Sequence, residues 1–272
     1  MISKFSSQNK GDMSLAKKLP LGYSSSLPLL DYGAYKLERN GYENVGIQDE
    51  IYPNAIPYLY LPEQKRNWNH SHIIWVTDKQ AKTLGKTVNI LEKIPLGEEY
   101  FYQTKDFLKL NGGKWANFRR QVNYFKNHYK YEIVSKNIGR EQINTFLNKW
   151  LKSQEVKNGI FASSYDFFLF CLENRARYKI KTIFILVEGE LAGIAMGIKY
   201  DNKNWIGLHS KILYKYKGLG KFILHERAKL FQNLDSFTLG TGAQDKGITE
   251  FKKSIHPSKE IKYYYVITGD NK

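Results

Sequence analysis

The order of periodic segments after residue 130 constrains the fold more than any other feature of this sequence. Alternating apolar residues predict strands, and apolar residues three or four positions apart predict helices. This order predicts a mixed sheet of the α/β class. The predicted elements are a strand at 131–135, helices at 143–151 and 163–177, strands at 182–187, 191–200 and 204–213, a helix at 218–231, a strand at 236–239, a helix at 246–254 and a strand at 261–268.

The first half of the chain has a weaker pattern. Between residues 42 and 61 prolines interrupt a stretch rich in Tyr and Ile, which suits edge strands and turns better than a helix. A buried strand is predicted at His72–Val76, with a short helix directly after it, and another strand at Glu99–Gln103. This half is therefore also mixed α/β.

The charge of the chain is strongly positive. The 272 residues include 42 Lys and Arg against 26 Asp and Glu, a formal net charge of +16. Residues 1–95 contribute a net +3, whereas residues 96–272 contribute +13. Such a field attracts polyanions such as RNA, anionic lipid headgroups or a nucleotide-bearing cofactor. A genome that uses lysine freely explains much of the excess equally well.

Composition also limits the class of protein. With 42% hydrophobic residues the chain can bury a core, and no apolar run approaches the roughly 20 residues of a membrane span. The first 21 residues lack the apolar stretch of a secretory signal. A single cysteine, Cys171, excludes an internal disulfide, and the lack of a Cys/His cluster argues against a structural zinc site. We therefore expect a cytoplasmic protein without a metal.

A helix predicted at 115–127 has a basic polar face. Its apolar stripe is Phe118, Val122 and Phe125, while the polar side lacks the acidic residues that surface helices usually mix in. Such a face suits a phosphate, a tRNA backbone or an acceptor carboxylate. Alternatively, one arginine pairs with a carboxylate at the edge of the core. The candidate contact residues are Arg119, Arg120 and Asn123.

A glycine-rich turn lies between the strand at 204–213 and the following helix. Glycines let the backbone approach a phosphate, and N–H groups at a helix N-terminus point at it. A strand-to-helix turn without any ligand is the alternative interpretation. The candidate donor-binding residues are Lys215, Lys217, Gly218, Leu219, Gly220 and Lys221.

The element order and this turn together resemble the GNAT (N-acetyltransferase-like) acyltransferase core. The turn is similar to the family's pyrophosphate-binding signature, Gln/Arg-x-x-Gly-x-Gly/Ala, with Lys215 in place of Gln or Arg. A lysine suits an anion, but not with the same side-chain geometry. The resemblance implies that backbone N–H groups of the strand at 205–213 help to stabilise an oxyanion.

Two further stretches narrow the resemblance. Residues 106–125 and 242–252 are similar to blocks of the phosphatidylglycerol lysyltransferase C-terminal family, also called domain of unknown function 2156. The second stretch also resembles the Gly-x-x-x-Phe-Lys block of Fem-type aminoacyltransferases. The resemblance covers roughly residues 25–268. It implies tandem GNAT-like folds, with a degenerate N-terminal domain at 1–130 and a transferase domain at 131–272.

Acyl transfer to an amine needs a proton acceptor, oxyanion donors and positioning of both substrates. His209, in the middle of its strand, is a candidate base, although a strand histidine often only hydrogen-bonds a neighbour. The resemblance to Fem-type enzymes implies that Lys252 meets the donor ester carbonyl, although an ordinary solvated lysine also fits. Glu250 and Asp245 are candidate acids or bases, and Asp245 also suits a helix cap.

The resemblance implies an acyltransferase that moves an acyl or aminoacyl group to an amine or hydroxyl acceptor. The glycine turn favours acyl-CoA as the donor, while the family blocks and the positive charge favour aminoacyl-tRNA. The acceptor is a small molecule, a peptide or a lipid headgroup, either soluble or reached at a membrane surface. The alternative is a non-catalytic RNA- or anionic-membrane-binding protein on a GNAT scaffold.

Overall fold

A computed structural model describes residues 2–17, 19, 22–39, 42–47, 56–57, 68–135, 138–155, 162–242 and 246–272. The chain forms two compact units. Unit 1 comprises Met1–Tyr100, Leu239–Ser254 and Lys259–Lys272, and unit 2 comprises Phe101–Thr238 and Ile255–Ser258. Each unit is therefore built from segments that are separated in the sequence. The domain boundary predicted after residue 130 remains a prediction.

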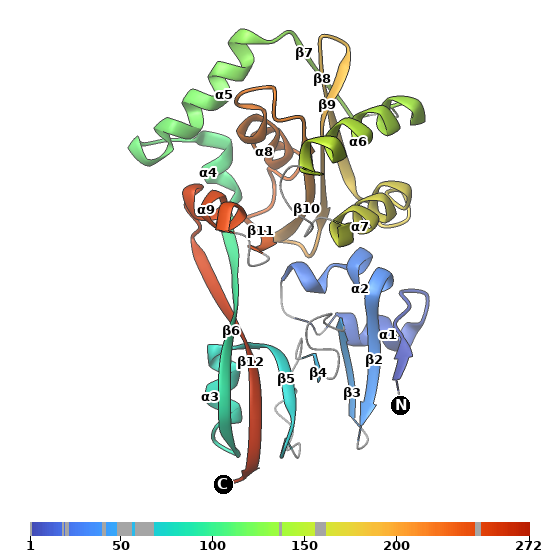
Figure 1. Ribbon diagram of the computed structural model, residues 1–272, viewed down its shortest axis with the longest axis vertical. Coiled ribbons are helices and arrows are strands. Elements are labelled where there is room, and N and C mark those ends of the chain that lie inside the picture. Colours follow the sequence, from blue (N-terminus) through green and yellow to red (C-terminus); the bar gives the residue numbers. More distant parts are fainter. Residues whose placement is uncertain are drawn as a thin grey trace. The chain divides into compact units, whose positions relative to one another are not determined.

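Unit 2 contains a sheet in the order β11-β10-β9-β8-β7 (Figure 1). The predicted mixed sheet is confirmed, since β7 to β10 pair antiparallel and β10 pairs parallel with β11. The predicted elements of this unit are present, with ends within four residues of the predicted ones. The elements are α4 Thr104–Lys109, α5 Ala116–His128, β7 Tyr131–Val134, α6 Arg140–Glu155, α7 Ala162–Glu173, β8 Lys181–Val187, β9 Glu190–Lys199, β10 Asn204–Ile212, α8 Leu219–Lys229 and β11 Ser236–Thr241.

Helix α8 is the centre of unit 2. All side chains from 221 to 228 are buried, because the sheet covers one side of the helix and α4 and α5 cover another (Figure 1). Phe125 of α5 stacks on Phe222 with ring centroids 4.5 Å apart, and His225 Nδ1 lies 2.7 Å from Phe107 O of α4. On the sheet side, glycines admit the helix closely. A Cβ on Gly193 would lie 3.0 Å from Ile223 Cδ1.

A β-bulge interrupts the pairing of β10 with β9. Gly207 pairs with Gly197 and His209 with Met196, so Leu208 is the extra residue of the bulge. An extra residue shifts the alternation of side chains by one. Parallel pairing of β10 with β11 ends close by, after Ile206 and Thr238. The bulge therefore sits where β10 stops pairing with β11, and it decides which face each later side chain occupies.

Unit 1 contains a three-stranded sheet, β1-β2-β3, and four further strands that pair in the order β4-β5-β12-β6. Thr77 and Gln80 form a reciprocal capping box that starts α3 directly after β5, as the sequence predicted. Strand β6 begins eleven residues before its predicted start at Glu99. The prediction missed this part because the stretch 91–95 is exposed throughout and shows no alternation of buried and exposed residues. The elements are β1 Ile2–Lys4, α1 Lys10–Ala16, α2 Leu27–Gly33, β2 Ala34–Arg39, β3 Tyr42–Ile47, β4 Ile56–Pro57, β5 His72–Thr77, α3 Asp78–Leu84, β6 Val88–Gln103, α9 Lys246–Ser254 and β12 Lys259–Asn271.

The described helices include none that is both long and apolar enough to cross a membrane.

Candidate functional site

The glycine turn at the start of α8 packs against α5. Gly218 has φ +86°, and a Cβ at this position would lie 2.3 Å from the carbonyl oxygen of Gln121. Only glycine fits there, because it tolerates positive φ and has no side chain to meet the α5 backbone. The Lys217 N–H donates to Tyr129 Oη over 3.2 Å, and the Leu219 N–H donates to Tyr216 O over 3.2 Å. Two N–H groups of the turn are thus engaged within unit 2.

Lys215 is held by a carboxylate of β9. Its Nζ lies 2.6 Å from Glu190 Oε2, while Lys149 lies 2.6 Å from Oε1. Burial by itself would raise the pKa of Glu190, but hydrogen bonds from Lys149, Lys215 and Tyr216 lower it to about 2. The hydrogen bond to Glu190 raises the pKa of Lys215. The side chain expected to bind a donor anion therefore already has an anionic partner.

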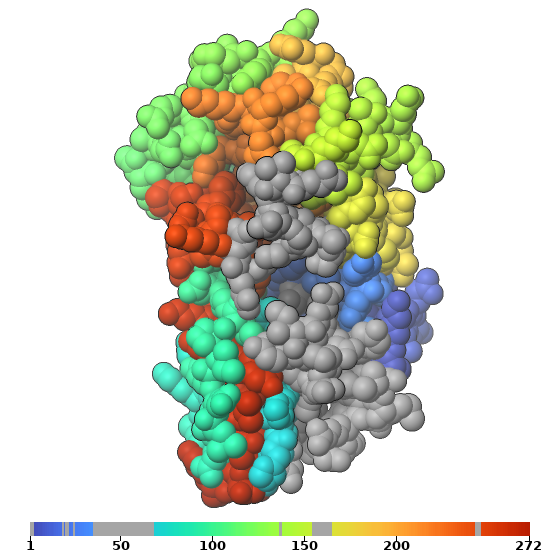
Figure 2. Space-filling model, in the orientation of Figure 1, coloured from blue at the N-terminus to red at the C-terminus, as the bar shows by residue number. Residues whose placement is uncertain are grey.

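The three polar residues predicted on α5 have different surroundings. Arg119 is half-buried, and its guanidinium donates to the carbonyl oxygens of Leu110 and Gly112, which closes the end of α4. Arg120 donates only locally, to Asn117 Oδ1 over 3.0 Å, and Arg120 and Asn123 are exposed. The outer side of α5 is visible at the surface in Figure 2. Arg119 has a structural contact, whereas Arg120 and Asn123 remain accessible.

Lys221 and Lys217 bring the turn and α5 together. Lys221 is buried, with Nζ 5.3 Å from the centre of the Phe118 ring, and burial lowers its pKa to about 8. Exposed Lys217 extends over Tyr124 at 4.8 Å. The structure thus places the predicted donor-binding turn beside the helix with the predicted RNA contacts.

His209 lies at the β10 bulge, on the side of the sheet covered by α7. Its ring packs edge-on against Phe167 and Phe168, with centroids 5.1 and 5.7 Å away. His209 Nε2 is buried and has no hydrogen-bond partner among the described residues. Burial lowers the pKa of His209 to about 3, helped by the charges of Lys211 and Arg227. The imidazole is neutral at pH 7, and its low pKa makes it a weak base.

Lys211 lies two residues after His209 on the same strand and is only 4% exposed. Its Nζ is 3.6 Å from the centre of the Trp150 ring of α6 and 5.2 Å from that of Phe168 of α7. Burial lowers the pKa of Lys211 to about 7. We call Lys211, Trp150, Phe168 and His209 the Lys211 cluster.

The remaining predicted residues lie in unit 1. Lys252 of α9 is buried, and its ammonium donates to Leu239 O over 2.7 Å and to Thr241 O. Glu250 is exposed, 4.0 Å from Lys246 of the same helix. Asp245 lies outside the described residues. Lys252 thus connects α9 to the end of β11, and Glu250 is a solvated carboxylate.

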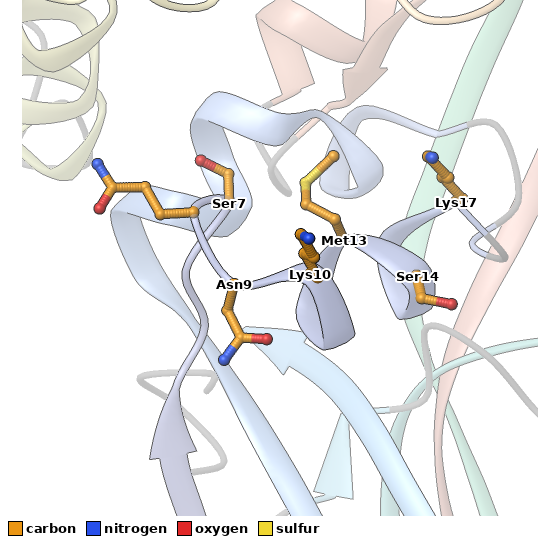
Figure 3. Close-up of a pocket in the computed structure, with 7 residues that line it drawn as sticks. Ser7, Asn9, Lys10, Met13, Ser14 and Lys17 are labelled. Carbon is orange, nitrogen blue, oxygen red and sulfur yellow. The ribbon is translucent and has the colours of Figure 1, made fainter.

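Two cavities lie apart from all of these predicted residues. One cavity of about 300 Å³ lies beside α1 in unit 1, and Ser7, Lys10 and Lys17 are among the residues that line it (Figure 3). The other, of about 340 Å³, lies at the β7 and β8 ends in unit 2, beside Lys130 and Glu188. Within the part of the chain that the structure describes, no cluster of three or more His, Cys, Asp or Glu is suited to a metal ion.

Comparison with known protein families identifies the chain. Residues 63–266 match the model of the family described as "Phosphatidylglycerol lysyltransferase, C-terminal". The chain belongs to this family. The resemblance in the sequence blocks is thereby confirmed. No curated protein matches the chain.

Solved structures share the mixed α/β fold of this family member. A conserved protein of unknown function from Bacteroides thetaiotaomicron VPI-5482 aligns with a TM-score of 0.63 at 17% identity, over 73% of this chain and 70% of that chain. L-PGS from Bacillus licheniformis aligns with 0.51 at 16% identity, over 72% and 67%. FemX aligns with 0.51 at 9% identity, over 96% of both chains. The degenerate character of the N-terminal half remains a prediction.

Sequence analysis missed Lys211, Trp150 and Arg227. Trp150 follows the amphipathic spacing of α6, which indicates a core residue. A lysine inside the apolar strand 204–213 was a visible signal, but strict alternation places it on the same face as Trp205. The bulge at Leu208 instead moves it to the opposite face, and a bulge has no reliable signature in a single sequence.

Proposed function

We propose that the chain transfers an aminoacyl group from aminoacyl-tRNA to an amine or hydroxyl acceptor. The observation that carries the proposal is the packing of basic helix α5 on the glycine turn, in a chain of the phosphatidylglycerol lysyltransferase C-terminal family. Helix α5 contains no acidic residue, and its exposed Arg120 and Lys126 suit the phosphates of a nucleic acid.

The turn is less suited to the pyrophosphate of acyl-CoA. A phosphate cradle needs N–H groups that point at the ligand. Here the Lys217 N–H is bound to Tyr129, the Lys215 ammonium is bound to Glu190, and Gly218 faces the α5 backbone. These contacts favour the tRNA donor over the CoA donor. The acceptor's chemical class is an amine or a hydroxyl, on a small molecule, a peptide or a lipid headgroup.

The test is transfer of a radiolabelled amino acid from charged tRNA, with Arg120→Glu as the variant. This exposed side chain bonds only within α5, so its replacement leaves the fold intact. We expect transfer by the wild type and a KM for charged tRNA raised about tenfold in the variant, most strongly at low salt. Lys203→Glu, in the turn between β9 and β10, is the control with the same charge change.

Two outcomes would contradict the proposal. Micromolar binding of CoA, abolished by Gly220→Glu, together with label transfer from an acyl-CoA, would assign a thioester donor. Salt-dependent binding of RNA or of vesicles rich in anionic lipid, without transfer from any charged tRNA or thioester, would assign a non-catalytic binding role.

A further inference from the structure

We propose that Lys211 accepts the proton of the attacking amine or hydroxyl during aminoacyl transfer, from a position on β10 where its amine rests on the Trp150 ring. This role depends on the proposed function, because it concerns the nucleophile of that reaction. The placement of the side chain, its aromatic surroundings and, among the described residues, the lack of a carboxylate partner support this role.

The β10 bulge determines where the side chain of Lys211 lies. On β9, a Cβ on Gly193 would meet Ile223 of α8, and a Cβ on Gly197 would meet Phe231 just after α8, so both glycines face this helix. Lys211 pairs with Ile194 and His209 with Met196, so both side chains occupy the opposite face. Without the extra residue Leu208, strict alternation would send them toward α8. The bulge thus directs two basic side chains toward α6 and α7.

The surroundings of the Lys211 amine are aromatic. Trp150 lies 3.6 Å from Nζ and Phe168 lies 5.2 Å away, which is cation–π distance for both rings. Attraction between an ammonium and these π faces positions the Lys211 side chain beside the two rings. Phe168 also packs edge-on against His209, so the cluster is one connected group.

Charged groups around Lys211 do not neutralise it. Among the described residues no carboxylate forms an ion pair with Lys211, and its nearest titratable neighbour on β10 is His209. From α8, the Arg227 guanidinium faces His209 O. Among the charged side chains on the packed helices, those that the structure describes are exposed. They are Arg140, Glu141, Lys149 and Lys152 on α6, and Asp166 and Glu173 on α7.

An amine in this setting can work as a base at neutral pH. Burial lowers the pKa of Lys211 to about 7, so half of the chains carry a neutral amine near that pH. The pKa of His209 at about 3 makes the imidazole a far weaker acceptor. Glu250 is solvated, and the Lys252 ammonium donates to two carbonyl groups.

The proposed step balances in atoms and charge. The acceptor nitrogen or oxygen forms a bond to the carbonyl carbon of the aminoacyl ester, and its proton passes to Lys211 Nζ. The carbonyl becomes an oxyanion, then re-forms as the bond to the ribose oxygen of the tRNA breaks. The proton on Lys211 leaves with that ribose hydroxyl, which regenerates the neutral amine.

The experiment combines a titration with kinetics on the full chain. The first readout is the pH titration of ¹³Cε-labelled lysine by NMR, with the Lys211 signal assigned from Lys211→Arg. We expect one lysine signal that titrates near pH 7, whose shift changes in Trp150→Leu because the ring current is lost. A Lys211 signal that titrates with the other lysines overturns the proposal, whatever the activity.

The second readout is the pH profile of transfer from charged tRNA. We expect kcat of the wild type to rise to a plateau with an apparent pKa near 7. Lys211→Met and Lys211→Arg should both lower kcat by about 10²- to 10⁴-fold with KM for tRNA unchanged, and remove the limb near pH 7. Arg keeps the charge, so loss in both variants assigns the effect to the proton acceptor. Lys199→Met, an exposed lysine of β9, should retain the wild-type profile.

The outcomes separate this role from the proposed function. Transfer by Lys211→Arg with wild-type kcat and pH profile overturns the role of Lys211 and leaves aminoacyl transfer standing. A folded wild type that transfers nothing from charged tRNA overturns the proposed function and, with it, this role. Because Lys211→Arg keeps charge and similar length, it guards against a Lys211→Met variant that fails to fold.

Discussion

Arg227 Nη1 donates a hydrogen bond to His209 O over 3.1 Å, at the bulge that interrupts the pairing of β10 with β9. The same Nη1 donates to Met196 O over 3.2 Å, and Met196 is the β9 partner of His209. One buried guanidinium on α8 therefore holds both strands at the bulge. The bulge in turn orients His209 and Lys211, so Arg227 connects the centre of unit 2 to the Lys211 cluster.

Replacing Arg227 by Met is expected to loosen the bulge. Two carbonyl groups lose a charged donor inside the core, and we expect the free energy of unfolding to fall by about 1–3 kcal/mol. The pKa of His209 should rise from about 3, because one of the positive charges that lower it is gone. Urea denaturation and histidine NMR titration measure the two effects. Arg120→Met, exposed on α5, should change stability by less than about 0.5 kcal/mol. An unchanged His209 titration would contradict the electrostatic part.

Gly218→Ala is expected to destabilise far more than Gly189→Ala. Both glycines have positive φ, +86° and +81°, so each alanine costs about 1–2 kcal/mol for the left-handed conformation. Only at Gly218 would the new Cβ lie 2.3 Å from a backbone oxygen, that of Gln121, whereas Gly189 has open space. The additional clash should bring the loss at Gly218 to about 3–5 kcal/mol. Equal losses in urea denaturation of the two variants would show that α5 does not press on the turn.

The second half of the fold was predictable because its elements are self-contained. Three strands joined by short turns, and helices with one apolar stripe such as α6, have a period that a single sequence shows directly. The start of β6 was not predictable, because an exposed stretch without alternation looks like a loop. The helix α8 was predicted from one apolar face, but its burial on all sides was not, since its polar residues lie inside, under α4 and α5.

The sequence predicted the parts of the site that lie in a recognisable local motif, but not the contacts between those parts. The glycine turn and α5 were both identified from sequence, but their contact depends on tertiary packing that no spacing reveals. His209 was predicted as a candidate base because histidine titrates near neutral pH. Lys211 was not predicted, because the face of the sheet on which its side chain lies depends on one extra residue, Leu208. The partners that hold Lys215 and Lys252 also come from tertiary contacts.

The Glu190 ion pairs are expected to stabilise unit 2 in a pH-dependent way. The pKa of Glu190 is lowered to about 2 in the folded chain, against about 4.3 when unfolded. The contribution is therefore present above about pH 4.3 and is lost as the pH falls through about 2. Because the two lysines are more than half exposed, we expect Glu190→Gln to cost about 1–2 kcal/mol at pH 7. Thermal unfolding of both chains at pH 7 and pH 2.5 measures the difference, which should shrink at the lower pH. A constant difference would contradict it.

Lys211 is expected to lower stability as the pH falls, as Glu190 does, but in a much more alkaline range. In the folded chain the pKa of Lys211 is about 7, against about 10.4 when unfolded. Between these values the unfolded chain binds a proton that the folded chain does not, so falling pH favours unfolding, and the effect levels off below pH 7. Lys211→Met lacks this pH-dependent contribution to the free energy of unfolding. Its stability relative to the wild type should therefore rise by about 3–5 kcal/mol as the pH falls from 10.5 to 6. Lys199→Met, which removes an exposed lysine, should follow the wild type throughout. Parallel urea denaturation curves for wild type and Lys211→Met across this range would show that the Lys211 amine is solvated, and would leave the cluster without its proposed base.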